Sequence, residues 1–270
     1  MEYPLANLIK RGESHIALAE IMHQKCTNRK RKKESYYRIV LSFFFSRSWE
    51  IYKSLILLIK ANKIIDGAIL VRSLCNMAID LAYITKDSNQ KEVTSIKYCI
   101  EGDKAQINIT KANKDDLRDI DSNIDLRLEE LKKNVEKLKE YFSLKYPNEA
   151  SLSYPRKISK RAEEVGGYIL KLYNMVYKNF SNIEHHNMFF GQDYVNFSKS
   201  EPILNPEKLR KSDLYRPEFL LYLHEWIFLM ILVVFNWEYR LNFRKELSDR
   251  IKIHKKAFED LKKIRKSASV

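Results

Sequence analysis

The sequence predicts an all-α protein, a single domain built as a bundle of about seven or eight helices. Its 270 residues include only 6 Gly and 6 Pro. Sheet proteins need many turns, which these residues largely form, so their scarcity disfavours sandwiches, barrels and doubly wound sheets. Apolar residues also recur at helical spacing over long segments. Because 45% of its residues are apolar, the chain is able to bury a sizeable core.

The first half of the chain holds four helical patterns separated by short breaks. Ser35 is placed to cap the second pattern. Gly102 is expected to end the fourth, because glycine is favoured just after a helix. The apolar spacing predicts these helices over residues 13–25, 36–61, 67–86 and 88–101.

A strict heptad pattern occupies the middle of the chain. Its apolar positions follow one another at spacings of 3, 4, 4, 3, 4, 3 and 4, with charged residues between them. We expect a long amphipathic helix over about 114–142 that packs along one partner, either within the chain or in a dimer. The apolar positions are Leu117, Ile120, Ile124, Leu128, Leu131, Val135, Leu138 and Phe142.

Three further helices are expected in the second half of the chain. Gly166 and Gly167 lie inside the first, where two glycines are tolerated most easily if two backbones approach closely. Pro217 suits the first turn of the second. The stretch 188–215 is the only long irregular segment and a candidate lid loop. The three helices are predicted over residues 157–187, 217–246 and 246–266.

Positive charge gathers at the two ends of the chain. The sequence has 49 basic and 35 acidic residues, a net charge of +14. The N-terminal segment 1–34 has 8 basic and 4 acidic residues, and residues 240–270 have 11 basic and 4 acidic. Such ends favour a polyanionic partner such as nucleic acid, although solvated helix faces carry similar charges. No RNA-binding signature with paired aromatic residues on strands is present.

The cysteines and the apolar stretches bear on localisation. The three cysteines form no CxxC pair, and a sparse, odd count is typical of a reducing cytosol. No signal peptide is expected at the first residues. The most apolar stretch lies within 219–237 and is interrupted by His224 and Glu225. Because a membrane span needs about 20 apolar residues, we expect a buried helix, no membrane span and a cytoplasmic protein.

Polar side chains recur every fourth position on the helix predicted over 157–187. Residues four apart share a helix face, and this stripe comprises Tyr173, Tyr177, Ser181 and His185. Asn182 and His186 lie on the adjacent face. Imidazole titrates near neutral pH, so either histidine is a candidate general acid or base. The alternative is a polar end of a core helix, with these side chains bonded to the backbone.

Arg72 lies within an otherwise apolar helix. A guanidinium in such surroundings needs an anion or several acceptors, because an unpaired buried charge is costly. In one interpretation, Arg72 binds a phosphate in a helical cleft. The other pairs it with a carboxylate from another helix, such as Glu225. Asn76 and Asp80 follow Arg72 by one and two turns.

Neither a metal nor another cofactor is expected. Glycine-rich phosphate loops, zinc spacings and hydrolase motifs are absent from the sequence. The side chains that could bind a metal are those of Glu184, His185, His186, Asp80 and Glu225. Adjacent residues of a helix point about 100° apart, so His185 and His186 do not easily bind one ion together. No Glu-x-x-His pair recurs, as a di-iron bundle would require.

Two segments carry short motifs in a fixed order. The first reads Leu-Val-Arg-Ser-Leu at 70–74 and ends in Asp-Leu-Ala-Tyr at 80–83. The second begins with Arg-Ala-Glu at 161–163 and continues through the Tyr-x3-Tyr and Ser-x3-His spacings. This arrangement resembles a widespread bacterial family of helical proteins of unassigned function. That family usually has Glu where Asn76 stands here, so Arg72 is expected to take another partner or a ligand.

The end of the second motif is also distantly similar to the HEPN superfamily (higher eukaryotes and prokaryotes nucleotide-binding). The motif of that superfamily is Arg-(polar)-x3-His, which Asn182 and His186 match, with Ser181 in the place of the arginine. HEPN proteins are helical bundles, often dimeric, and many are RNases of toxin or phage-defence systems. The resemblance implies either an RNase in which another residue, such as Arg72, supplies the missing charge, or a site that is not an RNase.

These observations predict a bacterial defence- or toxin-type protein that acts on nucleic acid, RNA rather than DNA, as a candidate metal-independent RNase. His185 or His186 would act as general acid or base, Arg72 would stabilise phosphate charge, and Ser181 and Asn182 would position the substrate. A second copy of the chain or a partner protein from a defence operon is expected. The alternative is a non-catalytic nucleic-acid-binding or assembly module that dimerises through the heptad helix.

Overall fold

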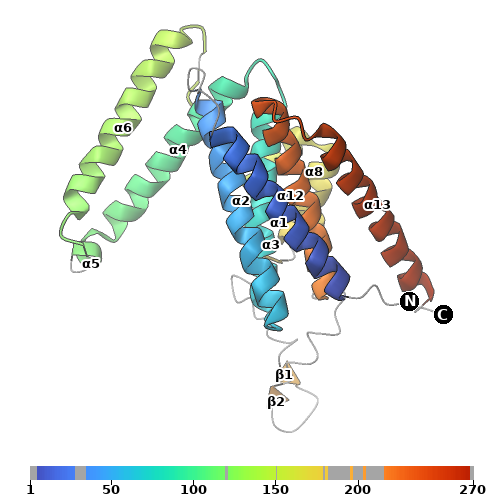
Figure 1. The fold of residues 1–270 in the computed structure, drawn as a ribbon. Helices are drawn as coiled ribbons and strands as arrows, with labels where there is room; N and C mark the ends of the chain where they lie inside the picture. Colours follow the sequence, from blue (N-terminus) through green and yellow to red (C-terminus); the bar gives the residue numbers. More distant parts are fainter. Residues whose placement is uncertain are drawn as a thin grey trace.

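The fold is an all-α helical bundle, as predicted from the sequence. The computed structural model describes residues 5–27, 35–118, 121–149, 151–178, 180–181, 195–196, 203–204 and 216–267. Within these residues it contains ten α-helices and a short π-helical segment. A main bundle of long helices holds the core, and an arm leans away from it (Figure 1). The arm is formed by α4 (Lys91–Ala112), α5 (Lys114–Arg118) and α6 (Ile124–Lys145).

The most apolar helix lies at the centre of the main bundle. This helix, α12, contacts four of the others and has the first-turn proline predicted from the sequence. By length and composition it is long and apolar enough to cross a membrane, and 67% of its most apolar window is buried inside the fold. The five long helices are α1 (Leu5–Thr27), α2 (Tyr36–Lys60), α3 (Ile64–Thr85), α12 (Pro217–Tyr239) and α13 (Arg244–Ser267).

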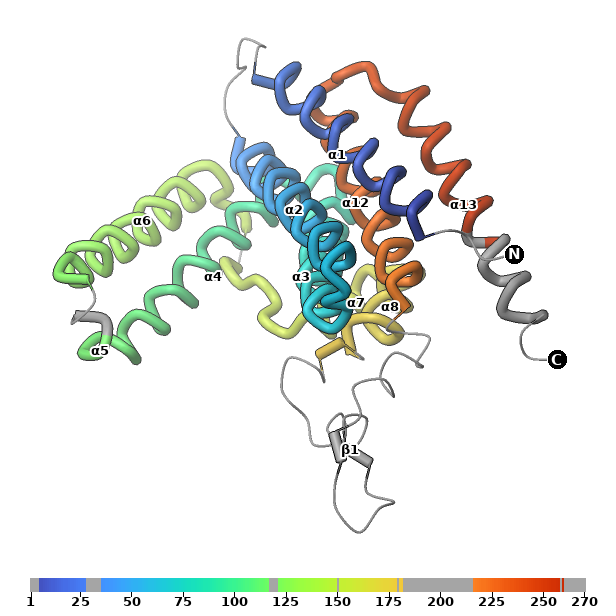
Figure 2. The backbone as a smooth tube through the Cα atoms, turned by 60° about the horizontal axis from the view of Figure 1, so that its bottom comes forward, coloured from blue at the N-terminus to red at the C-terminus, as the bar shows by residue number. Residues whose placement is uncertain are grey.

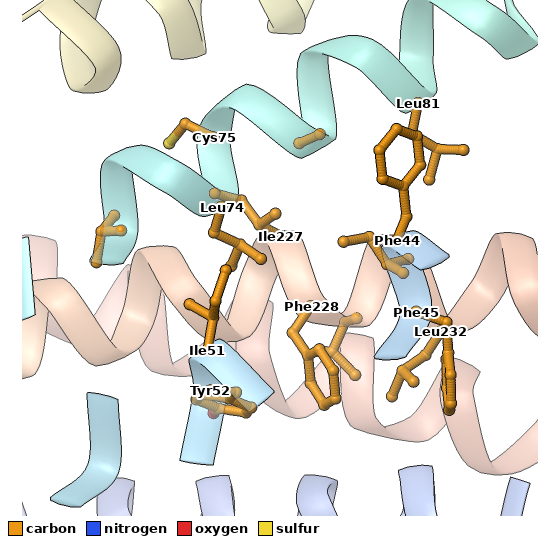
Figure 3. Close-up of a cluster of buried hydrophobic side chains, with 14 of the residues drawn as sticks. Phe44, Phe45, Ile51, Tyr52, Leu74, Cys75, Leu81, Ile227, Phe228 and Leu232 are labelled. Atoms are coloured by element: carbon orange, nitrogen blue, oxygen red, sulfur yellow. The ribbon is translucent and has the colours of Figure 1, made fainter. Parts of the chain in front are cut away.

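Large apolar side chains from α2, α3 and α12 interlock to form the core (Figure 3). The Phe45 ring stacks on Phe235 with centroids 4.0 Å apart. Tyr52 packs against Phe228 at 4.9 Å, and Leu74 is fully buried beside them. This core fixes the relative positions of the helices on which the candidate sites are built.

Two side chains cap the start of α2. The N–H of Arg38 donates to Oγ of Ser35 at 3.2 Å, which confirms the predicted N-cap. Glu92, from α4, accepts from the N–H groups of Tyr36 and Tyr37 at 3.0 and 3.1 Å. A carboxylate is favourable at a helix N-terminus, so Glu92 also joins the arm to the main bundle.

The arm consists of α4, α5 and α6. The described heptad positions of α6 pack on apolar residues of α4, so the partner of this face lies within the chain. One continuous helix over 114–142 was expected, but residues 121–123 form a turn. Asp121 Oδ1 accepts from the N–H of Asn123 at 3.0 Å, a local bond that competes with the helix. Gly102 was expected to end α4, but the helix continues past it, because Ile107 in a later turn packs with apolar residues of α6.

The helix expected over 157–187 is broken at its glycines. The structure has α7 (Ile158–Val165), α8 (Gly167–Leu172) and the π-helical segment η1 (Tyr173–Tyr177) in its place. Gly166 has φ +70° and Gly167 φ +51°, so both adopt left-handed conformations that favour glycine. A Cβ on Gly167 would meet nothing within 4 Å. The glycines therefore turn the chain, and the expected close approach of two backbones is not their role.

The helix expected over 217–246 ends early, at Tyr239. Arg240 is left-handed with φ 51°, and the Asn236 side chain accepts from the N–H of Phe243 at 2.9 Å. This turn reverses the chain into α13. In the candidate lid 188–215, β1 (Val195–Asn196) pairs antiparallel with β2 (Ile203–Leu204), and the other residues of that segment lie outside the described ones.

Two helical glycines allow a matched test of the packing. A Cβ on Gly12 of α1 would lie 2.8 Å from Cδ1 of Ile56, whereas one on Gly102 meets nothing within 4 Å. We expect Gly102→Ala to raise the free energy of unfolding by about 0.5–1 kcal/mol, through helix propensity. We expect Gly12→Ala to lower it by about 1 kcal/mol, because overpacking between α1 and α2 exceeds that gain.

Urea unfolding followed by circular dichroism measures both variants. Equal stabilisation by the two substitutions would show that α1 and α2 do not approach closely at Gly12.

Candidate functional site

A buried ion pair joins the two motif-bearing segments. Oδ1 of Asp80, on α3, lies 2.6 Å from Nε of Arg161, on α7. The hydroxyl of Tyr154 donates a hydrogen bond to the same oxygen at 3.1 Å. Arg161 also donates to the backbone carbonyls of Pro155 and Arg156. Both charged side chains are more than nine-tenths buried. This cluster docks α7 on α3, and Figure 2 shows α7 and α8 beside α3.

The cluster shows which groups pair with the Asp80 carboxylate. Asp80 lies two turns after Arg72 on α3, and its partners are Arg161 and Tyr154. Burial raises the pKa of Asp80 to about 6, against the opposing effects of Arg161 and the Tyr154 hydrogen bond.

Arg72 reaches the π-helical segment. Its Nη2 donates to the hydroxyl of Tyr177 at 3.1 Å, and its guanidinium carbon lies 4.9 Å from the centre of that ring. The rings of Tyr173 and Tyr177 stack with centroids 5.4 Å apart. A π-helical turn often marks a functional site in a helix. The arrangement thus holds a cation against the ring of Tyr177, which itself stacks on Tyr173, in the segment that leads to Ser181.

Only part of the predicted polar stripe lies within the described residues. Ser181 is helical and half-buried, one turn after Tyr177. Asn182, His185 and His186 lie outside the described residues. The structure therefore brings Arg72 to the start of this stripe, and the placement of the two histidines stays a prediction.

A second polar cluster lies at the centre of the bundle, around Glu225 of α12. Arg11 Nη2 lies 2.5 Å from Oε2, His15 Nε2 lies 2.6 Å from Oε1, and His254 Nδ1 lies 3.1 Å from Oε2. Arg250 in turn contacts Nδ1 of His15 at 2.6 Å. Arg11 and His15 come from α1, whereas Arg250 and His254 come from α13. Glu225 thereby ties both helices to α12.

The hydrogen bonds fix the protonation state of His15. A guanidinium only donates, so Nδ1 of His15 accepts from Arg250 and Nε2 carries the proton given to Glu225. Burial lowers the pKa of His15, and the charges of Arg250 and Arg11 act in the same direction, against the opposing effect of Glu225. Burial would raise the pKa of Glu225, but hydrogen bonds from His15 and His254 and the charge of Arg11 hold it well below its usual range. The cluster thus holds an ionised carboxylate beside a neutral imidazole.

Arg11, His15, Arg250 and His254 were not predicted from the sequence to form a site. Glu225 was named as a carboxylate that could pair with Arg72, but its ion pairs in the structure are with Arg11, His15 and His254. The signal was present as two Arg-x3-His spacings, one near each end of the chain, because residues four apart share a helix face. Nothing local in the sequence says that the two pairs converge on one carboxylate.

A cleft opens between α1 and α13 over this cluster. It has a volume of about 770 Å³, and Arg11, His15 and Arg250 form part of its wall. The remaining wall residues are Asn7, Lys10, Ser14, Asn242, Phe243, Lys245, Glu246, Asp249 and Ile253. Among the described residues, no group of three or more His, Cys, Asp or Glu side chains is arranged to hold a metal ion. The wall of the cleft therefore combines the cationic groups of Lys10, Arg11, Lys245 and Arg250 with the carboxylates of Glu246 and Asp249.

His224, next to Glu225 in the sequence, lies in the apolar core. Its ring is fully buried and stacks on Tyr52 with centroids 4.8 Å apart. Neither ring nitrogen has a hydrogen-bond partner among the described residues. Burial lowers the pKa of His224 to about 3. His224 is thus a neutral core residue with no link to the cleft.

One comparison with known proteins gave a match. A model described as "Family of unknown function (DUF5677)" matches residues 38–201, more than half of the chain. No curated protein and no solved structure matches the chain. The matched range contains Arg72, Asp80 and Arg161, whereas the helices α1, α12 and α13 lie outside it.

His224 should make the fold sensitive to acid. The unfolded chain takes up a proton there below pH 6.5, whereas the folded chain does so only near pH 3. Stability is therefore lost as pH falls through this window, by about 1.5 kcal/mol between pH 6.5 and pH 5. We expect His224→Leu to remove this part of the pH dependence and to be at least as stable as the wild type at pH 8, because it no longer buries an unpaired imidazole.

Chemical denaturation at several pH values measures the difference. Parallel stability curves for the wild type and His224→Leu would contradict the assignment.

Proposed function

We propose that this chain, which belongs to the DUF5677 family of unknown function, acts on RNA as a metal-independent, HEPN-like ribonuclease of a bacterial defence or toxin system. The observation that carries the proposal is the contact between Arg72 and Tyr177. It sets a permanent cation beside the helix that leads into Ser181, Asn182, His185 and His186.

The residue types support phosphodiester cleavage without a metal. One histidine, His185 or His186, takes the proton from a ribose 2′-hydroxyl as its oxygen bonds to phosphorus. The bond from phosphorus to the 5′-oxygen breaks, and an acid protonates that oxygen. Arg72 stabilises the negative charge of the pentacoordinate phosphate, and Ser181 and Asn182 position the backbone. The products are a 2′,3′-cyclic phosphate and a 5′-hydroxyl.

The stacked tyrosines support a single-stranded substrate. Tyr173 and Tyr177 are partly exposed, and their rings stack on each other, with the Arg72 guanidinium beside Tyr177. Aromatic faces bind bases regardless of sequence. The free thiols of Cys75 and Cys99 suit the reducing cytoplasm where such RNA is found.

Cleavage of a labelled single-stranded RNA by the purified protein tests this function. We expect the wild type to cut in the presence of EDTA, and His185→Ala or His186→Ala to reduce the rate by about a hundredfold or more. Arg72→Gln should also reduce it strongly, whereas Arg72→Lys keeps the charge and part of the activity. Arg127→Gln serves as the matched control, because that arginine is 68% exposed on the arm.

Melting curves establish that each variant is folded. The ribonuclease function is wrong if the wild type leaves RNA intact, or if both histidine variants cut at the wild-type rate.

The rival function is a non-catalytic nucleic-acid-binding or assembly module. The contact of α1 and α13 through Arg250 and His15 favours it, because it places the basic helix α13 beside the N-terminal helix. The described heptad face packs on α4, so a homodimer would have to use another surface. Binding without cleavage, with affinity falling steeply as salt rises, would select this function.

A further inference from the structure

We propose that the cleft between α1 and α13 is a binding site for a phosphorylated nucleoside. It uses none of the residues assigned to RNA cleavage, because its wall comes from α1, α13 and the turn between α12 and α13. The inference therefore stands apart from the ribonuclease proposal. Its volume of about 770 Å³ is within the usual range for a small-molecule pocket.

Four cationic side chains give the cleft its preference for a phosphate. Lys10 and Arg11 come from α1, and Lys245 and Arg250 come from α13. Lys10 and Lys245 are exposed and form no ion pair with any described residue. Their charges are thus available at the rim, where ammonium groups bind phosphate oxygens well.

The floor of the cleft is rigid. Glu225 holds Arg11, and His15 holds one nitrogen of Arg250, while Glu246 holds the other at 2.9 Å. Ser14 accepts a further hydrogen bond from Arg250 at 2.9 Å. His15 is 1% exposed. Side chains fixed in this way lose little conformational entropy when a ligand binds, which favours affinity.

The other wall residues fit a nucleoside better than a bare phosphate. Phe243 is half-buried, and Lys25 lies 4.8 Å from its ring centre. An aromatic ring of this kind is a platform on which a base stacks. Glu246 and Asp249 also line the cleft, and carboxylates accept hydrogen bonds from ribose hydroxyls. Cationic, aromatic and acidic groups together match phosphate, base and sugar.

Calorimetric titration of the full chain tests the site with AMP, GMP, CMP, UMP, adenosine and inorganic phosphate. We expect at least one mononucleotide to bind more tightly than adenosine and inorganic phosphate. The double variant Lys10→Gln/Lys245→Gln should weaken that binding about tenfold. These lysines are exposed, so the variant is expected to fold as the wild type does.

The matched control is Lys255→Gln/Lys256→Gln, which removes the same charge from α13 outside the cleft wall. It should change the affinity less than twofold. Absence of mononucleotide binding, or equal weakening by both double variants, would overturn the proposal.

A competition experiment identifies the source of the nucleotide. If a short RNA with a 5′-phosphate displaces the mononucleotide and the same RNA with a 5′-hydroxyl does not, the site binds RNA ends. If neither RNA displaces it, the ligand is a free nucleotide. Both outcomes support the site, and RNA cleavage by His185 or His186 succeeds or fails independently of them.

Discussion

A single buried carboxylate ties the first and last helices of the main bundle to its central helix. Glu225 is 2% exposed on the central helix, and an ionised carboxylate there costs several kcal/mol unless it is paired. Its partners come from α1 and α13, which carry the most separated parts of the chain. Removing one partner of such a pair typically costs about 3–5 kcal/mol, because the other charge stays buried. The positions of α1 and α13, and the cleft between them, therefore depend on this carboxylate.

The Asp80 cluster likewise attaches α7 to α3 through a buried carboxylate, but the pKa of this carboxylate is raised. Burial raises the pKa of Asp80 to about 6, since one guanidinium and one hydroxyl only partly offset it. Glu225 is also buried, but the hydrogen bonds of His15 and His254 and the charge of Arg11 lower its pKa. The number of donors around each carboxylate decides which effect prevails. Glu225 therefore stays ionised across neutral and mildly acidic pH, whereas Asp80 titrates within that range.

The sequence predicted the helices well because their apolar periodicity is a local property. It predicted the Ser35 cap and the proline at the start of α12 for the same reason. It did not predict the break at Gly166, because a glycine pair does not reveal the sign of φ. The contacts of the candidate site were harder to predict, because they join residues far apart in the sequence. Tyr177 contacts Arg72, 105 positions away, and His15 contacts Glu225, 210 positions away. Such pairs are set by how α3, α12 and their neighbours pack.

The family-matched residues and the cleft are separate parts of one molecule. The matched range runs over α2–η1 and includes Arg72 with Tyr177, whereas the cleft uses α1, α13 and the turn before α13. The two regions meet through the packing of α3 on α12. Because α12 carries Glu225 and α3 carries Arg72, a rigid core links the two surfaces while their functional side chains remain distinct. A substitution in the wall of one site therefore leaves the charges of the other in place.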